Sequence, residues 1–559
     1  MKKVLSYFAI ALIVASSAAD LFAQGARIVE RVYIATDKQS YIAGDRVWCS
    51  VYCFEAGEEL VMSDFSSTVY LELQDRNQVV LTAKVALTEG RGAGAIELPP
   101  TLPTGNYKLL GYTTQNRNEE GFSPEGKIIS IYNVMTAERV EGNVELTHKG
   151  IDVAIPVAQG NVAIEREKGG VVVELPTVEV KKGEEFHLKL KNGTEESASL
   201  SLSVYHTDPF VTRIDSGIVN FWEKAAHTSF GAVTGNLLPD YEGEVVRLNV
   251  SGGNDERMYV SFPGVHVDTY SSEVDDNGRA FIVTPNVYGD RDMVCEGGSA
   301  VSLQDPFIRE VKGDIPQLRL YPEMEEVLTR RGFSMQVGRR FDADTLYEKL
   351  PVRANILLDA NKVTYILDDY TRFTKMQEVL DEFVSEIRVR TVKKQKLLSI
   401  MVKTVEGTYY ANGYSLVMLD GVPVTDQSKI LDYDPLLLHR IEIYTGLYSI
   451  GNMFCEGVAN FITYKGDMTG YDFGDKVKIL PYKGAIYPLA FTGSRIQAGG
   501  AYPDYRETIY WHPLLEMERG SEEEIRCIAP MYSGDFEIVL EGVTRSGNPI
   551  FYKSTLKIR

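Results

Sequence analysis

The segment that decides the fold is VYIATDKQSYIAGDRVW, residues 32–48. Apolar and polar side chains alternate at both of its ends, which predicts two strands. Asp37-Lys38 and Gly44-Asp45 lie between these ends, and glycine and aspartate are residues that favour tight turns. The segment therefore predicts a strand, a turn and a second strand, as at the start of an antiparallel β-sheet.

The same alternation recurs along most of the chain, in short runs separated by turn residues. The clearest runs are residues 69–73, 171–180, 186–190, 200–205, 258–262, 280–284 and 536–541. Short strands at this spacing are typical of β-sandwiches. Asn277-Gly278 lies between two of these runs and predicts a hairpin, because this pair tolerates the positive φ of a tight turn.

The first segment also carries a specific pattern of polar residues, followed by LPTGNYKLLGYT at residues 102–113. The pattern consists of Asp37, Lys38, Tyr41, Gly44 and Asp45. Together the two segments resemble the MG2 domain of the α2-macroglobulin family. The resemblance implies a macroglobulin-like β-sandwich over residues 27–133.

Further domains follow from the spacing of the strand patterns. Residues 150–235, 238–314 and 475–559 each predict a β-sandwich, and residues 320–467 predict an inserted α/β domain. The fold class is therefore mainly β, with tandem immunoglobulin-like or macroglobulin-like sandwiches. Residues 502–511 resemble the start of the closing sandwich of large macroglobulin-like exported proteins, whereas residues 534–559 resemble a sorting domain for surface secretion, and the sequence leaves both open.

The strongest helical pattern covers residues 374–389. Its apolar stripe at helical spacing consists of Met376, Val379, Leu380, Phe383, Val384 and Ile387. Thr374 and Gln377 have the spacing of a capping box. The pattern predicts one continuous helix.

Three segments of the α/β region carry a second resemblance: LVMLDGVPVTD at 416–426, LDYDPLLLHRIEIYTG at 431–446 and GVANFITYKG at 457–466. They resemble the plug domain of TonB-dependent outer-membrane receptors. The matching residues are Asp420, Gly421, Asp434, Pro435, Ile441, Glu442, Gly446 and Gly457. Tyr464 and residues 453–456 depart from the pattern of that family.

The receptor barrel that normally surrounds such a plug is not expected here. Residues 468–559 are all that follow the plug-like segments. A barrel of about 22 strands at roughly 10 residues each needs more than 200 residues. We therefore expect a plug-like domain without a barrel, which cannot gate a pore in its own chain.

The first residues predict a secretory signal peptide over residues 1–23. Lys2 and Lys3 precede an apolar run at residues 4–14, and Ala23 provides a cleavage site. An uncleaved anchor is the alternative, but the run is shorter than the ~20 residues that cross a bilayer. We expect export to the periplasm, outer membrane or cell surface of a Gram-negative bacterium, with no other transmembrane segment.

Charge and cysteine content narrow the possible partners. The chain has 78 acidic and 58 basic residues, a net charge of −20, so no nucleic acid is expected to bind.

Five cysteines are few for an exported protein. Cys49 and Cys53 share one face of a predicted strand about 13 Å apart, too far for a disulfide, so buried free thiols are expected.

No catalytic, metal-binding or cofactor-binding residues stand out. The seven histidines are scattered, and no zinc, P-loop, dinucleotide or nucleophile-elbow motif is present. His187 and His206 fall in predicted strands of one domain and are expected to be ordinary strand residues. Segments 295–298 and 455–457 come nearest to the Cys-Gly-Glu-Gln thioester of protease-trapping macroglobulins, but neither matches. We expect no enzyme and no cofactor.

The sequence thus predicts a non-enzymatic cell-envelope binding or scaffold protein, associated with the outer membrane through a protein or glycan partner. One alternative is an accessory of TonB-linked nutrient uptake that docks to a separate TonB-dependent receptor. An alternative of another class is a hydrolase with an unrecognised site in a domain cleft. The 32 tyrosines suit binding surfaces, although most are explained as ordinary β-sheet residues.

Overall fold

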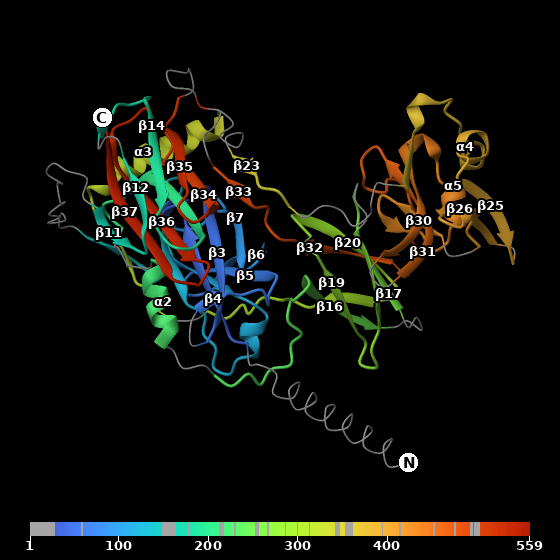
Figure 1. Cartoon of the computed structure of the whole chain (residues 1–559), viewed down its shortest axis with the longest axis horizontal. Helices are drawn as coiled ribbons and strands as arrows, with labels where there is room; N and C mark the ends of the chain where they lie inside the picture. The colour runs from blue at the N-terminus through green and yellow to red at the C-terminus, as the bar shows by residue number, and fades with distance from the viewer. Residues whose placement is uncertain are drawn as a thin grey trace, which may run out of the picture. The chain divides into compact units, whose positions relative to one another are not determined.

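The chain is mainly β and divides into two compact units, each described by itself below (Figure 1). The computed structural model describes residues 28–57, 60–147, 164–175, 179–211, 217–227, 231–251, 257–264, 268–285, 287–298, 300–311, 314–340, 347–352, 361–393, 395–412, 415–450, 453–474, 477–491, 496 and 503–559. The predicted signal peptide lies outside these residues. Among the helices of the described part, none is long and apolar enough to cross a membrane.

Unit 1 contains the described residues up to Tyr241, together with Ile308–Leu350 and Tyr487–Arg559. Its first sandwich has one sheet of β1 (Glu30–Thr36), β3 (Arg46–Ala56), β4 (Leu60–Met62) and β7 (Arg91–Glu97). The facing sheet has the order β2 (Ser40–Ile42), β9 (Gly126–Tyr132), β8 (Gly105–Tyr112), β5 (Thr68–Gln74) and β6 (Val79–Ala86).

Both faces of β1 and β3 are buried, which explains why these strands are almost continuously apolar. Val32 and Ile34 point to Gly111 in the facing sheet. Tyr33 and Tyr52 point the other way, into a cluster of apolar side chains that also contains residues of a second sandwich. The first sandwich is therefore packed against a neighbour within unit 1.

The second sandwich combines the middle and the C-terminal end of the chain. One sheet has the order β11 (Ile164–Lys168), β37 (Pro549–Ile558), β36 (Gly534–Thr544), β15 (Ala198–His206) and β34 (Thr508–Met517), with β13 (Glu179–Val180) also paired to β37. The other has the order β12 (Val171–Glu174), β14 (Glu185–Asn192) and β35 (Glu522–Ile528).

The prediction of separate sandwiches at residues 150–235 and 475–559 is therefore wrong. β15 lies between β34 and β36, and β14 pairs with β35, so both segments contribute to the same two sheets. Leu188, Leu202 and Ile538 lie in a single hydrophobic core. Period-two patterns identify strands, but they do not tell which strands pair.

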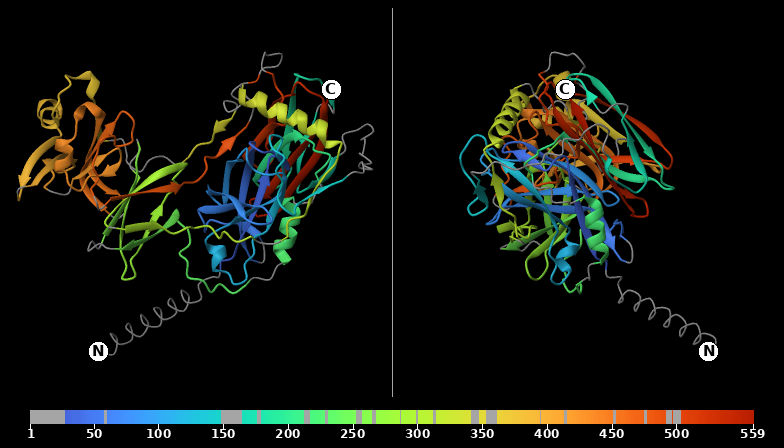
Figure 2. Two further views of the ribbon diagram at one scale, coloured as in Figure 1. Left: turned by 180° about the vertical axis from the view of Figure 1, so that it is seen from behind. Right: turned by 90° about the vertical axis from the view of Figure 1, so that its left-hand side faces the viewer.

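In the part of unit 1 that the structure describes, two α-helices and several short strands complete the fold (Figure 2). α2 (Ile218–His227) packs on β37 and β1, η1 (Gln115–Asn118) follows β8, and β10 (Val144–Leu146) pairs in parallel with β22 (Leu318–Leu320). α3 (Met324–Arg340) packs through Met324 against Ile42 and Tyr132. The predicted start of the α/β domain at residue 320 is wrong, because α3 belongs to unit 1.

Unit 2 contains residues 242–307 and 351–486. Its sandwich has one sheet of β19 (Arg279–Thr284), β16 (Glu244–Ser251) and β21 (Ala300–Leu303). The other has the order β18 (Asp268–Glu273), β17 (Arg257–Phe262), β20 (Asp290–Glu296) and β32 (Val477–Lys483). The prediction of a self-contained sandwich at 238–314 lacks β32, which comes from far along the chain.

The Asn277-Gly278 turn does not form the predicted hairpin. Gly278 has the expected positive φ of +70°. However, β18 pairs with β17 and β19 pairs with β16, so the turn connects strands of opposite sheets. The local turn signal was right, and the pairing inferred from it was wrong.

The α/β domain of unit 2 has a mixed sheet of order β24 (Lys362–Ile366), β30 (Leu438–Ile450), β31 (Met453–Thr463), β28 (Leu416–Leu419) and β29 (Val422–Pro423). β28 is parallel to β31, and the other pairs are antiparallel. A smaller sheet has the order β25 (Ile387–Val392), β26 (Gln395–Thr404) and β27 (Gly407–Tyr410). The helical segments among its described residues are η4 (Leu367–Asp369), α4 (Met376–Phe383), α5 (Ser428–Asp432) and η5 (Pro435–Leu437).

The predicted helix over residues 374–389 is too long. α4 ends at Phe383, and Ile387 already belongs to β25. Lys375 is the N-cap without a side-chain cap, so the predicted capping box does not form. Val384 and Ile387 are buried, as the apolar stripe predicts, but Val384 enters the core from a loop and Ile387 from a strand.

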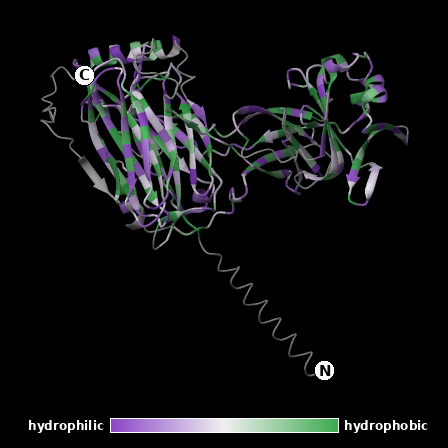
Figure 3. Ribbon diagram, turned by 45° about the horizontal axis from the view of Figure 1, so that its top comes forward, coloured by the Kyte–Doolittle hydropathy of each residue, from purple (hydrophilic) through white to green (hydrophobic). Residues whose placement is uncertain are grey.

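The two units are interleaved along the chain. The chain passes from unit 1 into the first part of the unit 2 sandwich, returns to unit 1 over residues 308–350, and then forms the α/β domain before β32 completes the sandwich. β23 (Glu348–Lys349) pairs with β33 (Leu489–Ala490), where the chain leaves unit 1 and returns to it. Along many of the other strands, hydrophilic and hydrophobic residues alternate, as is typical of sandwiches (Figure 3).

Candidate functional site

The motif that resembles MG2 lies inside unit 1, and Asp37 is its centre. Its carboxylate is fully buried. It accepts hydrogen bonds from the Tyr41 hydroxyl (2.7 Å), the Thr508 hydroxyl (2.6 Å) and the Trp48 backbone N–H (3.2 Å). Burial raises the pKa of Asp37. Because Thr508 begins β34 of the second sandwich, this one carboxylate connects the two sandwiches.

Lys38 and Asp45 extend the same network. Lys38 Nζ lies 3.7 Å from Asp37 Oδ2 and 3.5 Å from Asp45 Oδ2, and 4.7 Å from the centre of the Tyr41 ring. Asp45 also accepts a backbone N–H from within the turn at 3.1 Å. Gly44 has φ +96°, a conformation that glycine adopts without strain. The five motif residues therefore form one locked turn at a domain junction.

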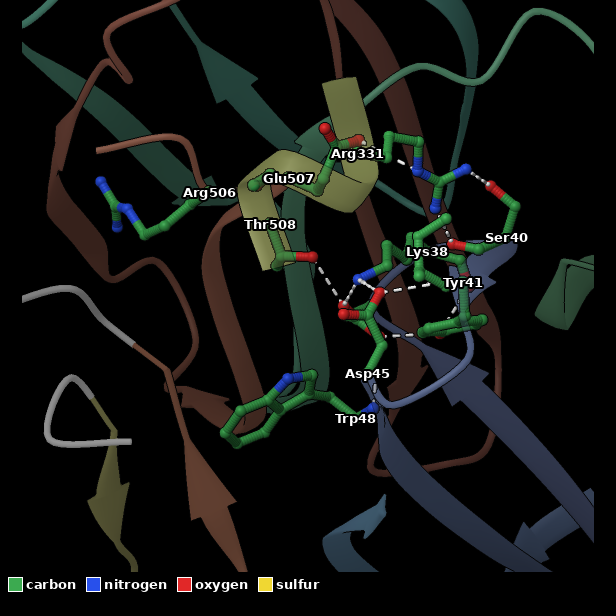
Figure 4. A network of polar contacts seen from close by, with 12 residues as sticks. Lys38, Ser40, Tyr41, Asp45, Trp48, Arg331, Arg506, Glu507 and Thr508 are labelled. Atoms are coloured by element: carbon green, nitrogen blue, oxygen red, sulfur yellow. Dashed lines mark hydrogen bonds and ion pairs between the residues drawn. The ribbon is translucent and has the colours of Figure 1, made fainter. Parts of the chain in front are cut away.

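α3 is attached to the same junction through Arg331. The buried guanidinium donates to the Ser40 carbonyl (2.8 Å), the Ser40 hydroxyl (2.9 Å) and Asp208 (3.0 Å). Glu507 lies 3.6 Å from its Nε. Figure 4 shows Arg331 between Ser40 of the first sandwich and Glu507 of the segment before β34.

A cleft of about 260 Å³ opens beside this network. Its aromatic wall consists of Trp48, Tyr347, Phe491 and Tyr505. Its charged side chains are paired within the protein: Arg46 with Glu97, Lys38 with Asp45, Arg331 with Glu507, and Arg506 with Asp504. A reaction needs a nucleophile or an acid–base pair directed at the substrate, and these groups are directed at one another.

Two buried charged residues were missed by the sequence reasoning. Arg91 of β7 donates to the carbonyls of Pro513 (2.6 Å) and Leu200 (3.2 Å) in the second sandwich. Glu541 of β36 accepts from the hydroxyl of Tyr33 (2.7 Å) in the first. They act like Asp37, as polar connections across the junction.

In unit 2, the Asp420-Gly421 pair of the plug-like motif lies at a junction, as Asp37 does in unit 1. Asp420 and Gly421 have φ +49° and +80° and form the turn between β28 and β29. The buried Asp420 carboxylate accepts from the Thr463 N–H (2.8 Å), the Thr463 hydroxyl (2.7 Å) and the Met468 N–H (2.8 Å). The Gly421 N–H donates to Asn460 Oδ1 at 3.0 Å. The pair therefore joins the ends of β28 and β31.

The same turn also touches the sandwich of unit 2. The Gly264 N–H donates to the Asp420 carbonyl and the Thr269 hydroxyl to the Gly421 carbonyl, both at 2.9 Å. The α/β domain and this sandwich are thus connected through backbone carbonyls of the motif.

The other plug-like residues shape the sheet. Ile441 is buried in the core, and Glu442 beside it bonds Arg440 (2.9 Å) and lies 3.1 Å from Lys362. Burial opposes ionisation of Glu442, but these cations outweigh it and lower its pKa. Gly446 lies where the β30–β31 register shifts.

Gly457 and Asp434 each have a local structural role. Gly457 has φ +77°, and a Cβ there would meet Ile400 at 2.6 Å. Asp434 caps η5 by accepting the Leu436 N–H at 2.9 Å, with Pro435 in the first helical position. The structure therefore brings Asp420 and Gly421 together and distributes the remaining motif residues over separate turns and strands.

The cysteines are buried free thiols, as expected for Cys49 and Cys53. Burial raises the pKa of Cys49, Cys295 and Cys527 to about 12 and that of Cys455 to about 11. The thiolate is the reactive form, so these thiols are inert near neutral pH.

The two strand histidines do not form a joint site. His187 is on β14 and contacts Glu185 at 3.1 Å, whereas His206 ends β15 in the other sheet. Burial, with a contribution from Arg330 and Arg331, lowers the pKa of His206 to about 3. Among the described residues, no group of three or more His, Cys, Asp or Glu side chains could hold a metal ion.

No protein-family model and no curated protein matches this chain. Among solved structures, it is similar to Escherichia coli alpha-2-macroglobulin activated by porcine elastase, with 8% identity, a TM-score of 0.24, and coverage of 95% of this chain and 44% of that one. It is also similar to Salmonella alpha-2-macroglobulin reacted with methylamine, with 8% identity, a TM-score of 0.16, and coverage of 95% of this chain and 23% of that one. The chain spans less than half the length of these proteins, and TM-scores this low support no conclusion about function.

Proposed function

We propose that this chain is an exported, non-enzymatic cell-envelope scaffold that binds a protein or glycan partner at the outer membrane, with a macroglobulin-like first domain. The main support is that both motifs lie at domain junctions. Asp37 connects two sandwiches by side-chain hydrogen bonds, and the Asp420-Gly421 turn connects the α/β domain to its sandwich. Residues used in this way give rigidity, which suits a scaffold.

The partner surface is assigned to the α/β domain. Leu447 and Phe454 on the β30–β31 hairpin are 49% and 62% exposed, and Tyr409 on β27 hydrogen-bonds Glu456 beside them. Exposed apolar groups that lie together are typical of interaction sites. The Asp420-Gly421 turn is hydrogen-bonded to the sandwich of unit 2, so the surface is presented on a fixed base.

Site-specific photo-crosslinking of the full chain in intact cells tests this function. A photo-reactive residue at Phe454 or Leu447 is expected to capture an envelope component. The same residue at Met135 or Met531, which are equally exposed in unit 1, serves as the matched control. Capture from the unit 1 positions alone, or from none of the four, would contradict the assignment.

The second candidate is an accessory of TonB-linked uptake that docks to a separate receptor. It is supported by the folding of Asp420, Gly421 and the end of β31 into one turn, since these residues carry the resemblance to receptor plugs. Affinity purification from detergent-solubilised outer membranes tests it. A barrel receptor that copurifies with the wild type and is lost with an Asp420→Ala variant that still folds is the expected result.

A further inference from the structure

The α/β domain carries a basic strand in an otherwise acidic protein. β25 and the start of β26 place Arg388, Arg390, Lys393 and Lys396 in exposed positions, in a chain of net charge −20. Glu386 is the one carboxylate of residues 386–404, and it accepts the Tyr365 hydroxyl at 2.6 Å. The charge of this segment is therefore opposite to that of the molecule.

The two arginines are held on one face of β25. Residues two apart on a strand share a face and lie about 7 Å from each other. The Arg388 guanidinium stacks 3.8 Å from the centre of the Tyr410 ring, and Arg390 donates to Asn412 Oδ1 at 3.2 Å. In the described part of the chain, neither forms an ion pair with a carboxylate. Stacking uses the face of a guanidinium and not its N–H edge, and it is the N–H edge that binds carboxylates.

β25 is also an edge strand. Among the described residues it pairs only with β26 in its three-stranded sheet, and it lies at the outer edge of the α/β domain (Figure 1). The Met401 N–H donates to the Glu386 carbonyl, and the register pairs Arg388 with Ser399. Since hydrogen-bonded positions alternate in antiparallel pairs, Arg388 and Arg390 bond β26 through their backbones, and Val389 and Thr391 direct theirs to the open edge.

We propose that β25 binds an extended segment of a partner protein as an added strand, with carboxylates at every second position. The open edge supplies the backbone hydrogen bonds, and Arg388 and Arg390 select acidic residues opposite them. Val389 points to the other face and packs on the domain core, so the intervening partner residues are apolar. This deepens the proposed function by naming the chemistry of the partner.

The test uses the full chain and a fluorescent peptide in which glutamate and valine alternate. We expect saturable binding by fluorescence anisotropy that weakens with salt. Arg388→Gln with Arg390→Gln is expected to weaken it at least about tenfold, because two charge-assisted contacts are lost. Arg257→Gln with Arg279→Gln, two exposed arginines of the unit 2 sandwich, makes the same charge change and is expected to leave binding unchanged.

Variants of Thr391 distinguish binding by strand addition from binding by charge attraction alone. Its side chain is exposed and its N–H faces the open edge, a position where proline is tolerated. Thr391→Pro is expected to weaken peptide binding about tenfold by removing an edge donor, and Thr391→Ala to have no effect. Hydrogen exchange gives a measurement that needs no variant: bound peptide is expected to slow exchange in residues 386–393.

Several results would overturn the proposal. These are the absence of peptide binding, equal binding of a peptide with its glutamates grouped together, or full binding by Thr391→Pro. Arginine-dependent binding to phosphatidylglycerol vesicles without peptide binding would assign the strand to lipid, and arginine-dependent self-association would assign it to a second copy. If the peptide fails while Phe454 still crosslinks an envelope component, the strand inference fails and the proposed scaffold function stands.

Discussion

At the residue scale, two buried carboxylates connect neighbouring parts of the fold, and each is surrounded by hydrogen-bond donors. Asp37 and Asp420 each accept three hydrogen bonds in an interior where an unpaired charge is costly. Both lie where a turn meets a neighbouring strand. Their loss removes an acceptor from several buried donors at once, which costs more than the loss of an exposed pair.

Asp37→Ala is expected to lower the free energy of unfolding of unit 1 by about 3 kcal/mol, because the Tyr41 hydroxyl, the Thr508 hydroxyl and the Trp48 N–H lose their acceptor. Urea denaturation followed by tryptophan fluorescence measures it. The exposed Asp64→Ala is the matched control, expected within about 0.5 kcal/mol of the wild type. Equal effects of the two changes would show that the network contributes little.

His206 predicts a pH dependence. Its pKa is lowered to about 3 by burial and then by Arg330 and Arg331, below the usual 6.5. Between these values the unfolded chain binds a proton that the folded chain does not, so stability falls as the pH falls. The loss between pH 7 and pH 5 is expected to be about 2 kcal/mol. His206→Gln is expected to reduce this slope, and an unchanged slope would contradict the assignment.

At the element scale, β15 is the central connection of the second sandwich. It lies between β34 and β36 and so joins two distant parts of the chain. A Cβ at Gly542 would lie 2.1 Å from the Ser199 carbonyl oxygen, so Gly542→Ala must separate β36 from β15. We expect a loss of more than about 2 kcal/mol and faster proteolysis within residues 164–206.

Gly520→Ala is the matched control in the same sandwich. Gly520 has φ +68° with no atom within 4 Å of its added Cβ, so only backbone strain of about 1 kcal/mol is expected. If limited proteolysis cleaved the two variants at the same rate, close packing of β36 on β15 would not be what holds the sandwich together.

The sequence predicted the strands better than their partners. Turn residues and period-two runs are local, so the strands of the first sandwich and the turn at Gly278 could be predicted. The pairing of β14 with β35 depends on residues more than 300 positions apart, and no local pattern encodes it. At the junction, Asp37 belonged to a recognisable motif. Glu541 did not, and its only signal was a charge between the apolar Val539 and Val543 on one strand face.

The overlong helix prediction has a related cause. Met376, Val379 and Leu380 are buried as a helical stripe should be. Beyond Phe383, apolar residues continue at a spacing that suits either a helix or a strand. Because this segment pairs with β26, it forms a strand. The strand exposes Arg388 and Arg390 on one face, whereas a helix would have distributed them around its surface.

At the scale of the whole molecule, each unit has its own core. Leu540 lies in the core of the second sandwich in unit 1, and Phe461 in the core of the α/β domain in unit 2. All three tryptophans, Trp48, Trp222 and Trp511, belong to unit 1. Tryptophan fluorescence therefore reports the unfolding of unit 1 alone, and far-UV circular dichroism reports both units.

Separate cores predict separate responses to mutation. Phe461→Ala is expected to cost about 3–5 kcal/mol in the α/β domain and Leu540→Ala about 2–5 kcal/mol in the second sandwich, since each leaves a cavity. Leu540→Ala should lower the urea midpoint seen by fluorescence, and Phe461→Ala should change only the circular dichroism transition. The double variant is expected to show the sum of both effects, as for independent sites. A shift of the fluorescence midpoint in Phe461→Ala comparable to that in Leu540→Ala would instead mean that the interleaved chain makes the two units unfold as one.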